Sequence, residues 1–276
     1  MKHLKNPIIL SCIILTISCK NKTQFECDNH YINGFNYLLS YDMKHAKSEF
    51  ELSIKDNPKN ANAYYGLAYY YFYSSDDKKA ISTLNKAIKI NPDFGMAYYV
   101  RADIKGIDGD SKGAIADLTT SISLNDGHAL AYYNRGTQYA NIGDQKNAIA
   151  DMDQTIKLRP DFYRAYYFRA TIKYHVGDME GAIEDYSQVI KIDPNNINAY
   201  YGRGISYGGS KKYQQAIDDL TKAIDLKTDI NAIYLYRGSY EYSLGKKEQA
   251  CADFEKAKSL NVPKADEYIA KYCNNK

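Results

Sequence analysis

Apolar residues recur at helical spacing in short segments along most of the chain. One segment carries Ala80, Ile81, Leu84, Ala87 and Ile88, which would form a single apolar face of a helix. A shorter segment, rich in tyrosine and alanine, precedes each segment of this kind. The pattern therefore predicts an all-α chain in which a helix A alternates with a helix B.

The helical segments repeat every 34 residues, seven times between residues 27 and 264. Tyrosine pairs that follow an alanine set the register: Tyr64 and Tyr65, Tyr98 and Tyr99, Tyr132 and Tyr133, Tyr166 and Tyr167, and Tyr200 and Tyr201. A second alanine stands in each helix B, at Ala80, Ala114, Ala148, Ala182, Ala216 and Ala250. One helix pair cannot bury both of its apolar faces, so we expect neighbouring units to stack.

A 34-residue unit with small residues at these two places, often closed by proline, resembles the tetratricopeptide repeat (TPR). The resemblance implies a right-handed superhelical solenoid of seven helix-turn-helix repeats, followed by a capping helix and tail at 265–276. The expected repeats are 27–60, 61–94, 95–128, 129–162, 163–196, 197–230 and 231–264.

Turn residues follow several of the expected A helices. Glycine stands at 109, 143, 177 and 245, where a helix end needs a left-handed residue. Aspartate comes next at 110, 144 and 178, where its side chain could accept from the first amides of helix B.

An arginine in helix A recurs together with an aspartate in helix B, sixteen residues later. A guanidinium in a packed seam needs a bidentate carboxylate partner, so we interpret the pairs as a structural ladder between the two helices. The alternative is a row of arginines that binds phosphate or carboxylate ligands. The pairs are Arg101 and Asp117, Arg135 and Asp151, Arg169 and Asp185, Arg203 and Asp219, and Arg237 and Asp253.

Residues 1–18 differ from the repeats. Lys2 and Lys5 precede an apolar stretch at 8–17, which is too short to span a bilayer and is typical of a secretion signal. The stretch ends in LTISC, which resembles a bacterial lipoprotein box and implies lipidation of Cys19. Residues 19–26 would then be a short tether to the outer membrane, on its periplasmic face. An ordinary cleaved signal and an uncleaved anchor remain alternatives, and Cys12 is a weaker acceptor.

Three further cysteines lie beyond Cys19. Cys251 on the last helix B and Cys273 on the capping helix stand about equally far from the expected turn at 261–264. Antiparallel packing would bring them within disulfide reach, so we predict a bridge there. Cys27 lies about six repeats away and is expected to be an unpaired thiol.

Composition and motifs exclude several classes of function. The formal charge is +3, and removal of Lys2 and Lys5 leaves +1, with both signs interspersed along the chain. That charge does not favour a nucleic-acid partner. The chain has no Walker loop, no dinucleotide fingerprint and no histidine-carboxylate metal spacing. We therefore expect no enzyme activity, no cofactor and no metal.

The TPR resemblance places the second tyrosine of each pair on the concave face, and the first in the core. Glycines near the ends of A helices, Gly106, Gly208 and Gly209, would widen the groove locally. The rings either bind a ligand or only pack against the next helix A, and the sequence leaves both open. The candidate groove residues are Tyr31, Tyr65, Tyr69, Tyr73, Tyr99, Tyr133, Tyr167, Tyr174, Tyr201 and Tyr242.

Two classes of function remain for such a chain. The first is a scaffold of the cell envelope, tethered through the N-terminal lipid, that binds a peptide or partner protein in the groove. The second is a glycan- or peptidoglycan-binding envelope lipoprotein, which the absence of tryptophan disfavours. A cytosolic TPR regulator is a third possibility if the N-terminal segment is not a signal.

Overall fold

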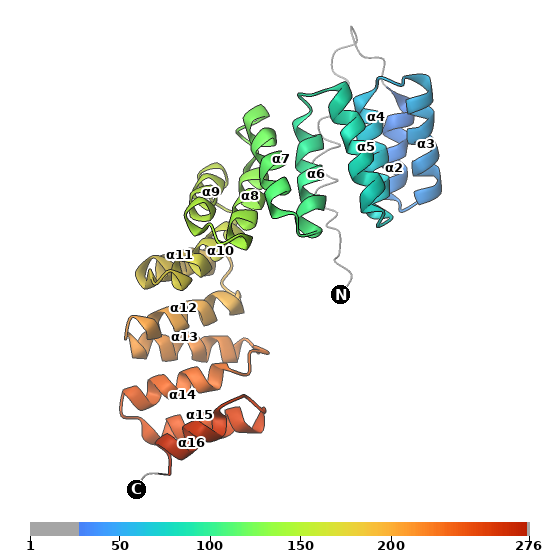
Figure 1. Ribbon diagram of the computed structural model, residues 1–276. Coiled ribbons are helices and arrows are strands. Elements are labelled where there is room, and N and C mark those ends of the chain that lie inside the picture. Colours follow the sequence, from blue (N-terminus) through green and yellow to red (C-terminus); the bar gives the residue numbers. More distant parts are fainter. Residues whose placement is uncertain (1–27, 275–276) are drawn as a thin grey trace. The chain divides into compact units, whose positions relative to one another are not determined.

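The computed structural model describes residues 28–274, and every regular element of this part of the chain is a helix (Figure 1). This confirms the all-α fold with repeating helix-turn-helix units and a terminal helix. The expected signal peptide, the tether, Cys19 and Cys27 lie outside the described residues. The helices are α2 (Asn29–Leu39), α3 (Met43–Asp56), α4 (Ala61–Tyr73), α5 (Asp77–Ile90), α6 (Gly95–Ile107), α7 (Ser111–Leu124), α8 (Ala129–Asn141), α9 (Gln145–Leu158), α10 (Tyr163–His175), α11 (Met179–Ile192), α12 (Ile197–Gly209), α13 (Tyr213–Asp225), α14 (Ile233–Ser243), α15 (Lys247–Ser259) and α16 (Ala265–Tyr272).

The chain divides into two compact units, whose described residues are 28–138 and 139–274. In the first unit, α2, α4 and α6 pair with α3, α5 and α7, and the B helices α3 and α5 also contact the next A helices, α4 and α6. In the second unit, α10, α12 and α14 pair with α11, α13 and α15, while α9 packs on α10 and α16 packs on α15 (Figure 1). The boundary between the units falls within α8.

Alanines mark the places where the helices of a pair approach each other. The alanine before each tyrosine pair and the alanine in each B helix have no exposed surface, so no larger side chain would fit at these positions without displacing a helix. The members of this set are Ala63, Ala97, Ala131, Ala165 and Ala199 on A helices, and Ala80, Ala114, Ala148, Ala182, Ala216 and Ala250 on B helices.

The turn from helix A to helix B has a left-handed residue in every repeat. Glycine takes this conformation at 109, 143, 177 and 245, with φ between 78° and 87°. Tyr41, Ser75 and Lys211 take the same conformation in the other three repeats, with φ near 60°. The expected caps are confirmed, because Asp110 and Asp178 each accept a hydrogen bond from a backbone amide of the following helix at 2.9 Å.

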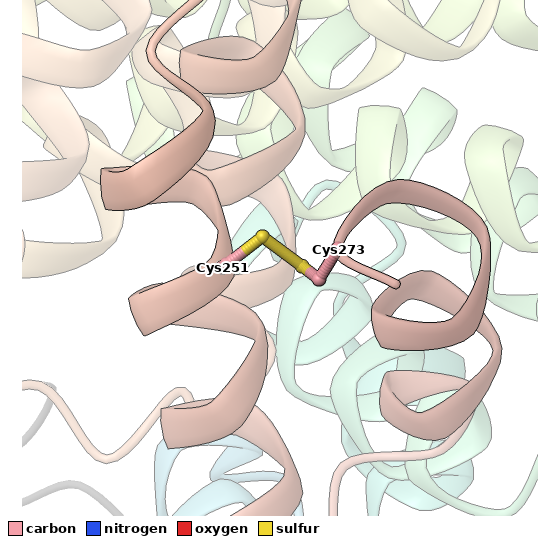
Figure 2. Close-up of a disulfide and its surroundings, with 2 residues drawn as sticks. All are labelled: Cys251 and Cys273. Carbon is pink, nitrogen blue, oxygen red and sulfur yellow. A yellow bond between two sulfur atoms is a disulfide. The ribbon is translucent and has the colours of Figure 1, made fainter. Parts of the chain in front are cut away.

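The C-terminal helix α16 covers the apolar flank of α15. Ile269 packs with Phe254 and Ala250, and the Tyr268 ring lies edge-on to Phe254, with the ring centroids 5.3 Å apart. A disulfide joins Cys251 on α15 to Cys273 at the end of α16, with the two Cα atoms 5.7 Å apart (Figure 2). A crosslink that closes a loop of this length stabilises a fold by about 3 kcal/mol, mainly by restricting the unfolded chain.

None of the helices in the described part of the chain has the length and apolar character needed to cross a membrane.

The left-handed turns give a direct test of the local backbone. Lys211 carries a side chain where φ is 59°, whereas Gly177 occupies the same place in another repeat and an added Cβ there would meet no atom within 4 Å. We expect Lys211→Gly to raise the free energy of unfolding by about 0.5 kcal/mol and Gly177→Ala to lower it by about 1 kcal/mol, because only glycine adopts this conformation without strain. Urea unfolding followed by circular dichroism measures both changes.

Lys211→Ala is the control, since it keeps a Cβ. A Lys211→Gly protein less stable than Lys211→Ala would show that the turn is not strained.

Candidate functional site

The arginines of the A helices bind aspartates of their own B helices through two parallel hydrogen bonds. In one repeat, Arg203 donates from Nε to Asp219 Oδ2 at 2.7 Å and from Nη2 to Oδ1 at 2.8 Å. Hydrogen bonding to Asp219 raises the pKa of the Arg203 guanidinium above its ordinary value. The same paired bonds, of 2.5 to 2.8 Å, join Arg101 to Asp117, Arg169 to Asp185 and Arg237 to Asp253.

Each of these arginines also reaches helix B of the preceding repeat. Nη1 of Arg101 donates to Asn85 Oδ1 at 2.6 Å, and Nη1 of Arg169 donates to Asp153. Arg135 likewise donates to Thr119. These acceptors all stand sixteen residues before their arginines, at Asn85, Thr119, Asp153, Ser187 and Thr221. The arginine therefore ties three helices together. Our sequence analysis missed this contact, although a polar side chain recurs there every 34 residues.

The first tyrosine of each pair forms one side of the arginine site. The guanidinium carbon of Arg101 lies 5.3 Å from the ring centre of Tyr98, and four equivalent pairs lie at 5.5 to 5.8 Å. These first tyrosines are partly exposed. They lie at the edge of the core, because most of them pack against its buried residues while the ring also lies beside an arginine: Tyr132, Tyr166, Tyr200 and Tyr234.

The aspartates of the ladder, Asp151 included, are buried, with 3 to 6% of their surface exposed. Lys105 adds a contact of 2.8 Å to Asp117, and Lys173 adds one of 3.0 Å to Asp185. In the last repeat, Glu241 stands at the position of Lys105 and Lys173. Its carboxylate oxygen Oε2 is buried without a hydrogen-bond partner. Burial and the neighbouring Asp253 raise the pKa of Glu241.

Three of the candidate groove tyrosines are buried in the first unit. Tyr65, Tyr69 and Tyr99 keep only 2 to 3% of their surface exposed. The ring of Phe94 lies 5.0 Å from the Tyr65 ring, and that of His128 lies 4.6 Å from the Tyr99 ring. For these three residues the groove assignment is corrected. An aromatic side chain just before the next helix A covers Tyr65 and Tyr99, whereas Tyr69 packs against the rings of Phe35, Tyr65 and Tyr73.

The remaining candidates of the first unit are partly buried. Tyr31 packs edge-on to Phe35, with ring centroids 5.1 Å apart, and Tyr73 stacks on Tyr69 at 6.3 Å. Tyr133 lies partly exposed on α8. None of these rings forms part of a continuous open row.

In the second unit the equivalent rings stay partly exposed. Tyr167 and Tyr174 project from α10, and Tyr201 projects from α12. Tyr236 on α14, which the sequence analysis missed, is 41% exposed and lies 6.1 Å from the Tyr201 ring. The position that Phe94 and His128 fill in the first unit holds Asn196 after Tyr167, and the Asn196 side chain caps α12. The same position holds Ile230 after Tyr201.

These four side chains, Tyr167, Tyr174, Tyr201 and Tyr236, are called the tyrosine surface below. They belong to one neighbourhood, because α12 contacts both α10 and α14. Burial raises the pKa of Tyr201, and the nearby phenols of Tyr236, Tyr174 and Tyr167 raise it further. The Tyr201 hydroxyl is thus uncharged at neutral pH, and a phenol hydroxyl can both donate and accept hydrogen bonds. Tyr242 lies apart, with its ring 4.5 Å from Tyr272 of α16.

The glycines expected to widen the groove face side chains of the following repeat. A Cβ added at Gly106 would lie 2.8 Å from Gln138 Nε2, and one added at Gly208 would collide with the Tyr240 ring. The expectation of a wider groove is therefore wrong at these two positions, because a large neighbour fills the space that the glycine leaves. Over residues 28–274, no group of three histidine, cysteine or acidic side chains is arranged to hold a metal ion.

Known repeat families and structures resemble the chain. A model described as the tetratricopeptide repeat matches residues 61–94, 129–162 and 197–230, and a second TPR repeat model matches 170–210. No curated protein matches the chain.

Several solved structures share the fold. YrrB, described as a TPR protein with an unusual peptide-binding site, has a TM-score of 0.62 at 20% identity, over 67% of this chain and 95% of YrrB. A TPR protein from Parabacteroides merdae has a TM-score of 0.60 at 20% identity, over 90% of this chain and 98% of its own. MamA has a TM-score of 0.59 at 25% identity, over 60% of this chain and 91% of MamA.

The ladder predicts an order of stability among arginine variants. Arg203→Leu leaves Asp219 buried without a cation and should cost about 3 kcal/mol. Arg169→Leu should cost less, because Lys173 remains 3.0 Å from Asp185. Urea denaturation of each variant measures the difference.

Two controls separate the ion pair from general damage. Arg159 is 48% exposed, lies 3.7 Å from Asp161 and has its guanidinium carbon 5.2 Å from the Phe162 ring centre, so Arg159→Leu should change the free energy of unfolding by less than about 0.5 kcal/mol. The double variant Arg203→Leu with Asp219→Leu should recover most of the loss, because no buried charge is left unpaired. A double variant as unstable as the sum of the single changes would contradict a coupled pair.

Proposed function

Because the chain carries tetratricopeptide repeats, we propose that it is a non-enzymatic scaffold that binds an extended peptide segment of a partner protein on the tyrosine surface. Proteins with TPR repeats mediate protein–protein interactions. The observation that carries the proposal is the partial exposure of Tyr167, Tyr174, Tyr201 and Tyr236 on three neighbouring A helices.

The chemistry of this surface suits a peptide. Phenol rings offer flat apolar area and lose little conformational entropy on binding, because each side chain has only two rotatable angles. Their hydroxyls can pair with peptide amides and carbonyls. The arginines nearby, such as Arg169 and Arg203, are already bound to aspartates, so the surface offers uncharged contacts instead of an anion site. YrrB, which shares the fold, is itself described as having a peptide-binding site.

The proposal also places the scaffold in a bacterial cell envelope, anchored to the outer membrane through a lipid on Cys19. The basic and apolar segment at 1–18 and the box-like LTISC sequence support export. The disulfide between Cys251 and Cys273 is also consistent with an oxidising compartment outside the cytoplasm.

Peptide selection tests the binding surface. The full-length protein is used to select a phage-displayed peptide library, and the dissociation constants of enriched peptides are measured by calorimetry. We expect Tyr236→Ala to weaken binding about tenfold, because a large ring would lose its contact with the peptide. Tyr41→Ala is the matched control, since Tyr41 is 74% exposed but lies in the α2–α3 turn.

Two results would contradict the peptide proposal. One is the absence of any enriched peptide, and the other is equal affinity of the enriched peptides for Tyr236→Ala and the unchanged chain. Saturable binding of peptidoglycan fragments or oligosaccharides, measured in parallel, would favour a glycan-binding function instead.

Fractionation of cells tests the anchor. We expect the natural chain in the outer membrane with an acylated Cys19 as its N-terminus, and Cys19→Ala released from the membrane fraction, because the lipid is the only proposed anchor. Mass spectrometry of the mature N-terminus identifies the modification. Cys12→Ala is the control and should remain membrane-bound. A natural chain that retains residues 1–18 and stays in the cytosolic fraction would rule out export.

A further inference from the structure

The side chains that share a helix side with the tyrosine surface carry no charge. On α12, Gly202, Ile205 and Gly208 follow Tyr201 at helical spacing and lie on the same side of the helix. The equivalent positions hold Phe168, Thr171 and Tyr174 on α10, and Tyr236, Ser239 and Tyr242 on α14. A ligand with an acidic or a basic side chain would find no ion-pair partner at these positions.

Charged or titratable side chains stand only at the two ends of this side of α10. Arg164 lies one turn before Tyr167, and His175 directly follows Tyr174. Arg169 and Arg203 belong to the ladder and are bound to Asp185 and Asp219. The surface therefore selects its ligand by shape and by uncharged hydrogen bonds.

Few polar groups on this side remain to pair with a bound backbone. The Thr171 hydroxyl donates to the backbone oxygen of Tyr167 at 3.0 Å, and the Ser239 hydroxyl donates to that of Leu235 at 2.6 Å. The backbone groups within the three helices are hydrogen-bonded to one another. The phenol hydroxyls are what remains, so an ordinary peptide would leave most of its buried amide N–H groups without a protein partner. Unpaired groups of this kind cost free energy.

A proline-rich segment avoids this cost. Proline has no backbone N–H, and its ring fixes φ close to the value of the polyproline II helix, so that little conformational entropy is lost on binding. Its carbonyl oxygens accept hydrogen bonds, which phenol hydroxyls can donate. Flat aromatic rings also offer apolar area for pyrrolidine rings, and aromatic-lined grooves are a general means of binding polyproline II helices.

The spacing of the A helices matches the pitch of such a ligand. A polyproline II helix has three residues per turn and rises about 3.1 Å per residue, so one turn is about 9 Å long. The axes of packed helices lie about 8–10 Å apart, and α12 contacts both α10 and α14. One turn of the ligand would therefore lie on each A helix, and three A helices would hold about nine residues.

We infer that the tyrosine surface binds a proline-rich segment of a partner protein in the polyproline II conformation, with a proline at about every third residue. Tyr236 is 41% exposed, and its ring is inclined by 72° to the Tyr201 ring, with the centroids 6.1 Å apart. The two rings form adjoining walls for one pyrrolidine ring, and Tyr167 and Tyr174 on α10 contact another turn of the ligand. This inference rests on the proposed function and adds the class of the peptide.

The experiment compares two uncharged peptides of equal length on the full-length protein. One consists of nine prolines, and in the matched peptide glutamine, serine and alanine alternate; both have blocked ends. We expect the proline peptide to bind at least about tenfold more tightly, by calorimetry or NMR titration. Its affinity should rise with length up to about nine residues and then level off, because three A helices hold three turns.

Salt dependence and variants test the contacts. Raising the salt concentration from about 0.05 M to about 0.5 M should change the affinity less than about twofold, because no ion pair forms. Tyr236→Ala should weaken binding of the proline peptide about tenfold, and Tyr236→Phe about threefold, because the latter loses only the hydroxyl. Tyr41→Ala, which changes an exposed ring outside the tyrosine surface, should leave the affinity unchanged.

The outcomes separate this inference from the proposed function. Selected phage peptides that are poor in proline but lose affinity with Tyr236→Ala would uphold the proposed function and overturn the inference. Equal affinity for the two peptides, no binding of the proline peptide at about 10 mM, or unchanged binding by Tyr236→Ala would each overturn it as well. If no phage peptide is enriched and the proline peptide does not bind, both fall.

Discussion

A guanidinium held between two B helices determines how the repeats are joined. The arginine of helix A binds the buried aspartate of its own helix B with two bonds and reaches a polar side chain of the preceding helix B with a third, at Arg101, Arg169, Arg203 and Arg237. A packed helical interface tolerates such a charge only when its donors are satisfied, so arginine, aspartate and the third residue depend on one another. The first tyrosine of each pair completes the arrangement, because its ring lies under the guanidinium.

In the two N-terminal repeats, which lack the arginine ladder, aromatic side chains pack between the helices. Phe50 fills the space between Gly34 and Gly66, where an added Cβ would meet its ring. Asp28 caps α2 and also accepts a hydrogen bond from Asn60 at 2.7 Å. Aromatic side chains cluster here, and Tyr65 is fully enclosed by Phe35, Tyr69 and Phe94. The second repeat carries Leu67 and Thr83 in place of the arginine and the aspartate, so apolar packing replaces the ladder there.

The same tyrosine position therefore has two roles within one chain. In the first unit Tyr65 and Tyr99 are enclosed, whereas in the second unit Tyr167 and Tyr201 remain partly open. Phe94 and His128, each 29 residues after the ring that it covers, enclose Tyr65 and Tyr99. The same position holds Asn196 after Tyr167 and Ile230 after Tyr201, and the Asn196 side chain caps its own helix.

The sequence by itself determined the helical hairpins, because period, alanine positions and turn residues are local or regularly spaced properties. Glycine at 177 and aspartate at 178, for example, indicate a helix end and the next cap without any knowledge of neighbours. The spacing of sixteen residues likewise suggested that Arg203 and Asp219 interact. Only the tertiary structure decided which tyrosines are accessible and that Arg203 also reaches Ser187. Burial depends on the side chains that adjacent repeats bring together, and a repeating pattern is the same whether a ring is covered or open.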